Sequence, residues 1–424
     1  MILPTIIIGA QWGDEGKGKI VDSLSKYSDI VVRFNGGNNA GHTVVVKGER
    51  FPLSLLPSGV VQRKKLFIAQ GVVITPQVLL SEIESFQKRG QKIDLTIDGR
   101  ANIVMPYHKL LDAATETSKG DKKVGSLKLG IGYCYEDRNN RHGIRLEDLV
   151  NPKLFKEKLE IEFIGVKKRL EAIYDFKVET TVSEIYSEYK HYGLLLKKYM
   201  GDVSRDINLS LGRKKILFEG AHGTFLDGNF GTYPYTTAVN TISGSVFSYV
   251  GFPPQKLNVI GVVKAYTTRV GSGPFPTELF NDTGTFIQEK GGEFGTVSKR
   301  QRRCGWLDMV MLKYSHRLNG FDTLVLTKLD VLSGLSEIKI ATSYKLMDKK
   351  INEFPSSLST LEKCRPVYSS YPGWKEDISG IRKYEELPRN CRNYIETIEK
   401  MSGVPVKYIS LGRERNQICQ KPIR

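Results

Sequence analysis

A glycine-rich segment near the N-terminus brings together residue types that can bind a chain of phosphates. Residues 9–19 read GAQWGDEGKGK and lie between an apolar run and a helical pattern. Glycines let backbone N–H groups approach phosphate oxygens closely, and the N-terminus of a following helix favours negative charge. Lys17 can reach the terminal phosphates. We therefore predict a phosphate-binding turn; the alternative interpretation is a strand-to-helix turn in which Asp14 is solvated.

The segment departs from the common phosphate loop at one informative position. That loop ends in Gly-Lys-Ser/Thr, and its hydroxyl group binds Mg²⁺. Here Gly18 follows Lys17, so the metal ligand must come from elsewhere, and Asp14 is the obvious donor. A carboxylate on a phosphate loop would repel the ligand unless Mg²⁺ lay between the two. The pattern therefore predicts Mg²⁺ binding at Asp14.

A second motif can read a guanine base. An apolar run at 323–326 is followed by Thr327-Lys328-Leu329-Asp330. The Asp330 carboxylate can accept hydrogen bonds from N1–H and the exocyclic amine of guanine, a donor pair that adenine lacks. The aliphatic part of Lys328 can cover the face of the base. Alone, this motif is more often a solvated pair that closes a loop, but together with the earlier phosphate turn it favours a guanine nucleotide.

Two further loops carry reactive side chains. Residues 36–43 read GGNNAGHT, and the small neighbours of His42 argue against a core histidine that fills an apolar slot. His42 could donate a proton or hydrogen bond to an oxygen that gains charge, or it could merely cap a helix.

Residues 298–303 form the second of these loops and read SKRQRR. Arginine binds carboxylates bidentately, so this loop could cradle a dicarboxylate; a solvated turn or an RNA contact are the alternatives.

The elements that position these loops alternate between strand and helix. Short apolar runs at 5–8, 30–34, 216–218, 257–263 and 323–327 predict buried strands, and 19–24 predicts the start of a helix. The stretch 151–200 favours helices packed outside a sheet, with Asn151 as the N-cap and Pro152 at the first helical position. We predict an α/β fold with a largely parallel sheet, in which ligands gather at the carboxyl ends of the strands.

The composition narrows the class of protein. The 424 residues are 40% hydrophobic and 26% charged, which is ordinary for a folded domain. No apolar run approaches about 18 residues, and the N-terminus lacks the features of a signal peptide, so we expect no membrane association. Five scattered cysteines without a C-x-x-C pair argue against disulfides and zinc and favour the cytoplasm. The net charge of +17 suits anionic ligands but is spread along the chain.

Motifs along nearly the whole chain, from Ile8 to about Gly412, resemble those of the adenylosuccinate synthetase family. They are GAQWGDEGKGKIVD, GGNNAGHT, FEGAHGTFLD, GTYPYTT, TRVGSGPFPTE, RRCGWLD and TKLDVLSGL. The resemblance implies one large α/β domain over 1–424, with a central mixed, mostly parallel sheet and a helical insertion at about 151–205. It also implies a homodimer and a GTP-dependent ligase that joins L-aspartate to inosine monophosphate (IMP) in AMP biosynthesis.

The resemblance assigns catalytic roles to three residues. Asp14 is implied to remove the proton from N1 of IMP, after which the 6-oxygen attacks the γ-phosphate of GTP while His42 supports that oxygen as the acid. The amino group of aspartate then displaces the 6-phosphoryl group, giving adenylosuccinate, GDP and phosphate. Lys17 stabilises charge on the transferring phosphoryl group. Mg²⁺ is implied to be held by Asp14 and the carbonyl of Gly41.

The resemblance also implies the contacts of each substrate. The GTP contacts are Gly13, Asp14, Glu15, Gly16, Lys17, Gly18, Lys19, Gly41, His42, Thr43, Arg302, Lys328, Leu329, Asp330, Ser410, Leu411 and Gly412. The IMP contacts are Asp14, Lys17, Asn39, Ala40, Gly41, His42, Leu127, Arg141, His222, Thr237 and Arg300, with Arg141 reaching the nucleotide of the neighbouring subunit. The aspartate contacts are Thr296, Val297, Ser298, Lys299, Arg300, Gln301 and Arg302.

Three stretches depart from the family pattern. Residues 126–129 read SLKL where the family has two threonines and a glycine-arginine pair. Leu127 lacks the hydroxyl that normally meets the 5′-phosphate, and its backbone N–H, Ser126 or Lys128 can substitute. His222 stands where a glutamine is usual, and the aspartate loop has Val297 and Lys299 in place of threonine and glycine. These changes concern nucleotide affinity and base selectivity.

Other functions remain open at this point. The altered nucleotide pocket would also suit a related ligase acting on another purine monophosphate, such as a guanine-containing one. A GTPase switch or GTP-binding regulator would hydrolyse GTP without aspartate and without consuming IMP. A basic nucleic-acid-binding protein would bind RNA or DNA with steep salt dependence. Because no motif interleaves aromatic and basic residues, we expect no nucleic-acid partner.

Overall fold

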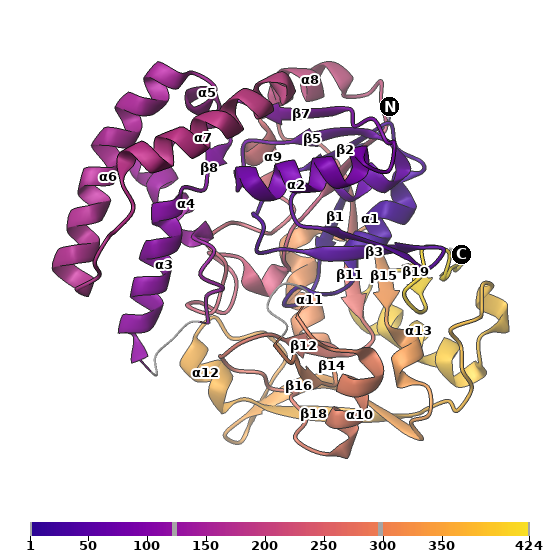
Figure 1. Cartoon of the computed structure of the whole chain (residues 1–424). Coiled ribbons are helices and arrows are strands. Elements are labelled where there is room, and N and C mark those ends of the chain that lie inside the picture. Colours follow the sequence, from indigo (N-terminus) through magenta and orange to yellow (C-terminus); the bar gives the residue numbers. More distant parts are fainter. Residues whose placement is uncertain (1, 121–124, 296–299, 423–424) are drawn as a thin grey trace.

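A ten-stranded sheet forms the centre of the molecule in the computed structural model, which describes residues 2–120, 125–295 and 300–422 (Figure 1). In spatial order its strands are β20 (Ile418–Gln420), β19 (Val406–Ser410), β15 (Thr323–Thr327), β11 (Asn258–Lys264), β1 (Thr5–Gly9), β10 (Ile216–Glu219), β2 (Ile30–Arg33), β5 (Lys65–Ile68), β7 (Leu95–Asp98) and β9 (Met200–Gly201). Neighbours pair in parallel except β19 and β20. The predicted mixed, mostly parallel sheet is confirmed.

The strands read as continuous apolar runs because both faces of the sheet are covered. Along β1, Ile6 and Ile8 enter one hydrophobic cluster and Ile7 enters the other, as the alternation of side chains in a strand requires. The first cluster includes side chains of helices within residues 203–319 and 389–402, and the second those of helices within 17–25, 76–118 and 152–196. The five runs predicted as strands all lie in this sheet, with ends shifted by one residue at most.

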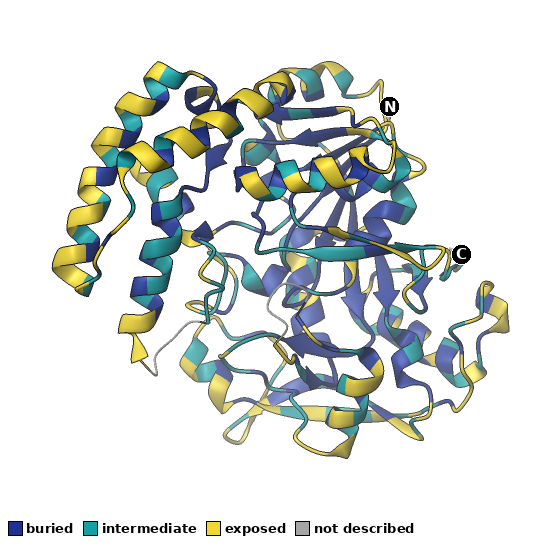
Figure 2. Ribbon diagram, in the orientation of Figure 1, coloured by how far each residue is buried: buried dark blue, intermediate teal, exposed yellow. Residues whose placement is uncertain are grey.

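Helices pack around the sheet, with their buried residues turned inward and their exposed residues outward (Figure 2). They are α1 (Lys17–Ser25), α2 (Pro76–Gln87), α3 (Pro106–Ser118), α4 (Ile131–Asn140), α5 (Leu146–Leu149), α6 (Pro152–Tyr174), α7 (Val182–Leu196), α8 (Val203–Ser210), α9 (Ser245–Val250), α10 (Asp282–Gly291), α11 (Met309–Asn319), α12 (Leu358–Lys363) and α13 (Arg389–Ser402). No helix within the described ranges is long and apolar enough to cross a membrane.

The helical stretch after residue 151 is built as its sequence predicts. The Asn151 side chain accepts a hydrogen bond from the Leu154 N–H at 3.4 Å and so caps α6, with Pro152 at the first helical position. α6 packs against α3 and α7, at the outer edge of the molecule (Figure 1). Residues 175–181 separate α6 from α7 and are not helical, so the stretch is two helices rather than one.

Small sheets border the central one. The hairpin of β3 (His42–Val46) and β4 (Glu49–Leu53) follows β2, and β12 (Thr267–Arg269) pairs with β13 (Arg303–Gly305). β16 (Glu337–Leu346) pairs with β14 (Leu307–Asp308), β17 (Lys349–Ile351) and β18 (Arg365–Pro372), while β6 (Val73–Ile74) pairs with β8 (Asn102–Ile103). All five cysteines are buried and carry free thiols.

Candidate active site

The glycine-rich segment forms a tight turn between β1 and α1. Gly13, Asp14 and Gly16 all have positive φ angles, of 84°, 59° and 88°. Such a run of left-handed residues lets successive backbone N–H groups converge on an anion. No side chain caps α1 at Gly16, so the first N–H groups of the helix remain for a ligand. The predicted phosphate-binding turn therefore has the required backbone geometry.

Glu15 shapes this turn from within. Its fully buried carboxylate accepts hydrogen bonds from the N–H groups of Gln11 at 3.0 Å and Gly13 at 2.9 Å. It also pairs with Lys17 Nζ at 2.6 Å. A Cβ atom at Gly9 would lie 2.5 Å from the same carboxylate, so a glycine is needed there. The sequence placed Glu15 among the GTP contacts, and the structure adds that its side chain braces the turn.

The two charged groups expected to act on the substrates are paired within the protein. Asp14 Oδ2 accepts a hydrogen bond from Arg302 Nε at 2.7 Å, although the Asp14 side chain stays 30% exposed. Lys17 Nζ also donates to the carbonyl of His222. Residues predicted from separate loops thus meet at this turn. The Asp14–Arg302 pair was not foreseen, because no local pattern links residues so far apart.

His42 lies against the phosphate turn in polar surroundings. A Cβ atom at Gly18 would come within 2.2 Å of His42 Cδ2, so the ring rests on the backbone of α1. His42 Nε2 is 2.7 Å from Ser58 Oγ, and Ser58 Oγ donates to Glu219 at 2.7 Å. Burial, with help from the positive charges of Arg33 and Lys17, lowers the pKa of His42 to about 3. The imidazole is therefore neutral near pH 7, and one of its two ring nitrogens carries a proton that it can donate.

The loop that carries His42 is braced by a buried arginine. Arg33 Nη2 donates to the carbonyls of Gly37 at 2.9 Å and Ala40 at 3.4 Å. Within the described chain, Asn39 Oδ1 is buried without a hydrogen-bond partner. Such an atom carries a cost of about 1–3 kcal/mol unless a ligand or water satisfies it. It marks the face of the loop that suits a polar ligand.

The Lys-x-Asp motif lies beside the phosphate turn. Thr327, at the end of β15, donates from Oγ1 to the Glu15 carbonyl at 2.7 Å. Asp330 Oδ1 is buried, and the described residues offer it no hydrogen-bond partner. Lys328 Nζ donates to the Gly291 carbonyl at 2.7 Å. A buried carboxylate oxygen left without a donor fits the predicted role of Asp330 in accepting from guanine.

The segment 410–412 contacts both the Lys-x-Asp motif and the first turns of α1. The Lys328 N–H donates to the Ser410 carbonyl at 3.1 Å, and Lys19 Nζ donates to the Gly412 carbonyl at 3.0 Å. Burial lowers the pKa of Lys19 to about 7, although Asp330 opposes the shift. The phosphate turn, the Lys-x-Asp motif and the segment 410–412 therefore contact one another at the carboxyl ends of β1, β15 and β19.

A cavity of about 450 Å³ opens between α4, α9 and the segment 228–240. Residues 236–240 line it together with Tyr135, Arg138 and Tyr249. Thr237 is the one predicted IMP contact among its lining residues, and the aromatic and Arg138 side chains were missed. No sequence pattern could find them, since Tyr135 and Arg138 come from α4 and meet Tyr249 of α9 only after folding.

His222 occupies a strained position next to this region. Its φ angle is 62°, and its Nε2 atom is buried with no partner in the described residues. Burial and the charges of Lys17 and Arg33 lower its pKa to about 3. A Cβ atom at Gly36 would lie 3.3 Å from that nitrogen, so the ring points at the 36–42 loop. Both His222 and Asn39 thus present unsatisfied polar atoms near the predicted nucleotide site.

The remaining predicted residues that the structure describes lie outside both the phosphate turn and the cavity lining. Arg141 is exposed at the C-terminal end of α4, where its φ of 68° ends the helix. Leu127 precedes α4 and is half-buried, and Arg300 Nη1 donates to the Gly125 carbonyl of the same loop at 3.0 Å. Gln301 pairs with Phe294 through an isolated bridge. The predictions for Thr296, Val297, Ser298 and Lys299 fall outside the described residues.

A mostly parallel sheet whose strand ends carry a glycine-rich, left-handed turn and a buried carboxylate oxygen is typical of α/β nucleotide-binding proteins. A family model described as adenylosuccinate synthetase matches residues 6–419. The chain is 50% identical over 416 residues to the adenylosuccinate synthetase of Carboxydothermus hydrogenoformans, which covers 97% of each chain. It is also 50% identical over 416 residues to that of Desulforapulum autotrophicum, covering 97% of this chain and 96% of the other.

A solved structure agrees with these relatives. The fully ligated adenylosuccinate synthetase of Plasmodium falciparum superposes with a TM-score of 0.94 at 41% identity, covering 100% of both chains. The chain therefore belongs to the adenylosuccinate synthetase family. It is a ligase of AMP biosynthesis that uses GTP to join L-aspartate to IMP.

A more distant structure shares the fold alone. The succinoaminodeoxyadenylate synthetase of cyanophage S-2L, bound to dGMP and dATP, superposes with a TM-score of 0.61 at 18% identity. At that identity the likeness shows the fold and carries no information on substrate choice. The alternatives of another purine monophosphate as substrate, or of a GTP-binding regulator, thus gain no support.

Proposed function

We propose that the loops around the phosphate turn carry out the ligation with the division of labour that the family motifs imply. Asp14 takes the proton from N1 of IMP, the 6-oxygen attacks the γ-phosphate of GTP, and the amino group of aspartate displaces the resulting phosphoryl group. The observation that carries this proposal is the hydrogen bond between Thr327 Oγ1 and the Glu15 carbonyl at 2.7 Å. It ties the guanine motif to the turn that holds Asp14.

Guanine recognition is assigned to Asp330. Its buried, unpartnered Oδ1 can accept from the N–H donors of guanine, while the stem of Lys328 covers the base. The segment 410–412 lies against both motifs and completes this end of the site. A base that lacks the donors leaves the carboxylate unsatisfied, which is the physical origin of the preference for GTP.

IMP is assigned to the cavity that Thr237 helps to line. The cavity lined by Thr237, Arg138 and Tyr249 is polar enough for a phosphorylated sugar, and Asn39 and His222 offer unsatisfied polar atoms to the base. His42, neutral and resting on α1, donates a hydrogen bond to the 6-oxygen as negative charge develops there. A positioned general base such as Asp14 contributes typically about 10²–10⁴-fold.

Mg²⁺ fits the donor set of the turn, with Asp14 and the Gly41 carbonyl as protein ligands. Among the residues described, no group of three or more His, Cys, Asp or Glu side chains converges as a metal site. That is compatible with Mg²⁺, which often binds through one or two carboxylates together with substrate phosphates. When bound, Mg²⁺ would neutralise charge on the phosphates of GTP.

L-aspartate is assigned to the basic loop. Arg300 and Arg302 supply guanidinium groups that can pair with carboxylates, and Arg302 already holds one carboxylate, that of Asp14.

We further propose that the enzyme is a homodimer in which Arg141, exposed at the end of α4, reaches the nucleotide of the neighbouring subunit. A cytoplasmic location is proposed on the five free thiols, which suit a reducing compartment.

Product identification tests the proposal. The protein is mixed with GTP, Mg²⁺, IMP and L-aspartate, and the products are identified by mass spectrometry. Adenylosuccinate, GDP and phosphate in equal amounts are expected, and no turnover when aspartate is omitted. Consumption of GTP without aspartate would indicate a GTPase instead, and equal turnover of guanosine monophosphate would overturn the assignment of IMP.

A further inference from the structure

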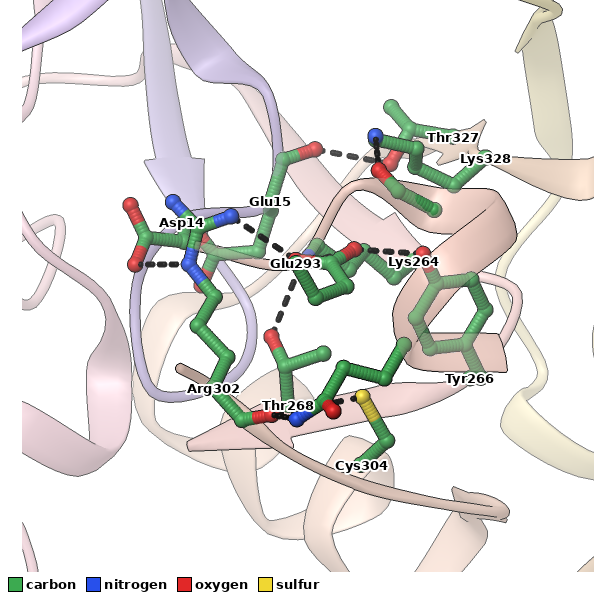
Figure 3. Close-up of polar contacts among 12 residues, drawn as sticks. Asp14, Glu15, Lys264, Tyr266, Thr268, Glu293, Arg302, Cys304, Thr327 and Lys328 are labelled. Atoms are coloured by element: carbon green, nitrogen blue, oxygen red, sulfur yellow. Dashed lines mark hydrogen bonds and ion pairs between the residues drawn. The ribbon is translucent and has the colours of Figure 1, made fainter. Parts of the chain in front are cut away.

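A buried network of charged side chains lies behind the Asp14–Arg302 pair (Figure 3). Lys264, at the end of β11, donates from Nζ to both carboxylate oxygens of Glu293, at 3.0 and 2.9 Å, and to Thr268 Oγ1 at 2.7 Å. The hydroxyl group of Tyr266 donates to Glu293 as well. Arg302 then links Glu293 to Asp14. None of the motifs that predicted the site includes Glu293 or Lys264.

The network is fully buried at Glu293 and Lys264 and reaches solvent at Asp14. Glu293 is 0% exposed and Lys264 is 1% exposed, whereas the Asp14 side chain is 30% exposed. Although burial raises the pKa of Glu293, the charges of Lys264, Lys328 and Arg302 outweigh it and bring the pKa to about 2. The carboxylate is therefore ionised. Desolvation largely offsets the attraction in such buried pairs, so stability alone is a weak reason for the arrangement.

The guanidinium group of Arg302 uses two different edges. Nη1 donates to Glu293 Oε2 at 2.8 Å, and Nε donates to Asp14 Oδ2 at 2.7 Å. The Nη1 edge faces a carboxylate that also accepts from Lys264 and Tyr266, so its partner is fixed on several sides. The Nε edge faces the partly exposed carboxylate of Asp14, which other groups can reach. The Nη1 edge of Arg302 is thus held by Glu293, whereas the Nε edge can exchange Asp14 for another carboxylate.

We propose that Glu293 is a positioning residue for the ligation: it anchors Arg302 so that the Nε edge can pass from Asp14 to a carboxylate of L-aspartate. The exchange replaces one carboxylate partner by another, so the charge around Arg302 is preserved. It leaves Asp14 unpaired for its work on IMP when aspartate is in place. Lys264 and Tyr266 hold Glu293 in turn. This inference rests on the proposed function of Asp14 and of the basic loop.

A positioning role and a purely structural role make different predictions. If Glu293 only stabilises the fold, its removal lowers the melting temperature and leaves the kinetic constants of the folded protein unchanged. If Glu293 positions Arg302, its removal raises the KM for aspartate in folded protein. It also lets the guanidinium group settle on Asp14, which lowers kcat. Steady-state kinetics with each substrate varied separately distinguishes the two roles.

The decisive variant is Glu293→Gln in the full-length protein. We expect the KM for aspartate to rise about tenfold or more, kcat to fall, and the KM for IMP to stay within about twofold, a tenfold change being about 1.4 kcal/mol. In an Arg302→Ala background, Glu293→Gln should have no further effect on the KM for aspartate, because Glu293 acts through Arg302. The matched control is Asp98→Asn, which alters another fully buried carboxylate, paired with Arg100 at 2.7 Å. That control should lower stability alone.

A second variant keeps the proposal testable if Glu293→Gln does not fold. Tyr266→Phe removes one hydrogen bond to Glu293 and keeps both charges. It should raise the KM for aspartate about threefold. An unchanged KM for aspartate in a folded Glu293 or Tyr266 variant, or an equal rise for IMP, overturns the proposal. If the wild-type enzyme makes no adenylosuccinate, the proposed function is refuted. If the wild-type enzyme is active and Glu293→Gln leaves the KM for aspartate unchanged, only the positioning role of Glu293 is refuted.

Discussion

Asp330→Asn separates nucleotide recognition from folding. In the wild-type protein, Asp330 Oδ1 is buried with no partner among the described residues, so the carboxylate costs stability until guanine donors satisfy it. Asparagine keeps the shape but loses the charge and can turn an N–H₂ group toward the donors of guanine. We therefore expect the ligand-free variant to be as stable as the wild type, or slightly more so, and its affinity for GTP to fall.

The size of the effect follows from the hydrogen bonds lost. A hydrogen bond to a charged group contributes about 1.5–3 kcal/mol, and loss of one such bond near the upper end of this range weakens GTP binding by roughly 100-fold. At a GTP concentration about 100 times the wild-type Kd, GTP adds about 2.7 kcal/mol to the free energy of unfolding. The same concentration would add only about 0.4 kcal/mol to the variant, where it roughly equals Kd.

Thermal unfolding with and without GTP measures this difference. Asp322→Asn is the matched control, because Asp322 lies just before β15 and its carboxylate accepts from the Val259 N–H at 2.7 Å, away from the guanine motif. That control should keep the full stabilisation by GTP. If GTP stabilised Asp330→Asn as much as the wild type, or if IMP binding weakened equally, the guanine assignment would be refuted.

Three further predictions concern the phosphate turn and its surroundings. Asp14→Asn should keep the fold, by circular dichroism, and lose about 10²–10⁴-fold in kcat as a positioned base is removed; wild-type turnover would exclude Asp14 as the base. Gly18→Ala places a Cβ atom 2.2 Å from His42 Cδ2 and should displace the imidazole and lower kcat at least about tenfold, a general acid–base contribution being typically larger. Gly132→Ala, with open space at its Cβ, should be harmless, and equal activity of the two variants would contradict this packing. For pH, the folded-state pKa of Glu293, about 2, lies below its ordinary value of 4.5, so its stabilisation is present above about pH 4.5 and fades toward pH 2. Urea unfolding of wild type and Glu293→Gln should therefore converge as the pH falls, and a constant difference would contradict the assignment.

Features that depend on contiguous residues could be predicted from the sequence. The apolar runs of β1 and β15, the Asn151 cap of α6 and the left-handed turn through Gly13 and Gly16 all follow from local backbone preferences and periodicity. The roles of Asp14, Lys17, Lys328 and Asp330 could be proposed because each side chain follows a strand whose end lies at one edge of a parallel sheet. Their places along the chain were enough to predict that they gather.

Partners from distant parts of the chain were decided by the tertiary structure alone. Asp14 and Arg302 are separated by 288 residues, and Lys264 meets Glu293 only because β11 and the end of α10 pack together. The Ser58–Glu219 pair beneath His42, and the unsatisfied oxygen of Asp330, likewise appear only once the strands are stacked. Local sequence fixes backbone angles and the face on which a side chain lies. The pairing of buried charges depends instead on which strands become neighbours, and that is settled by the packing of the whole core.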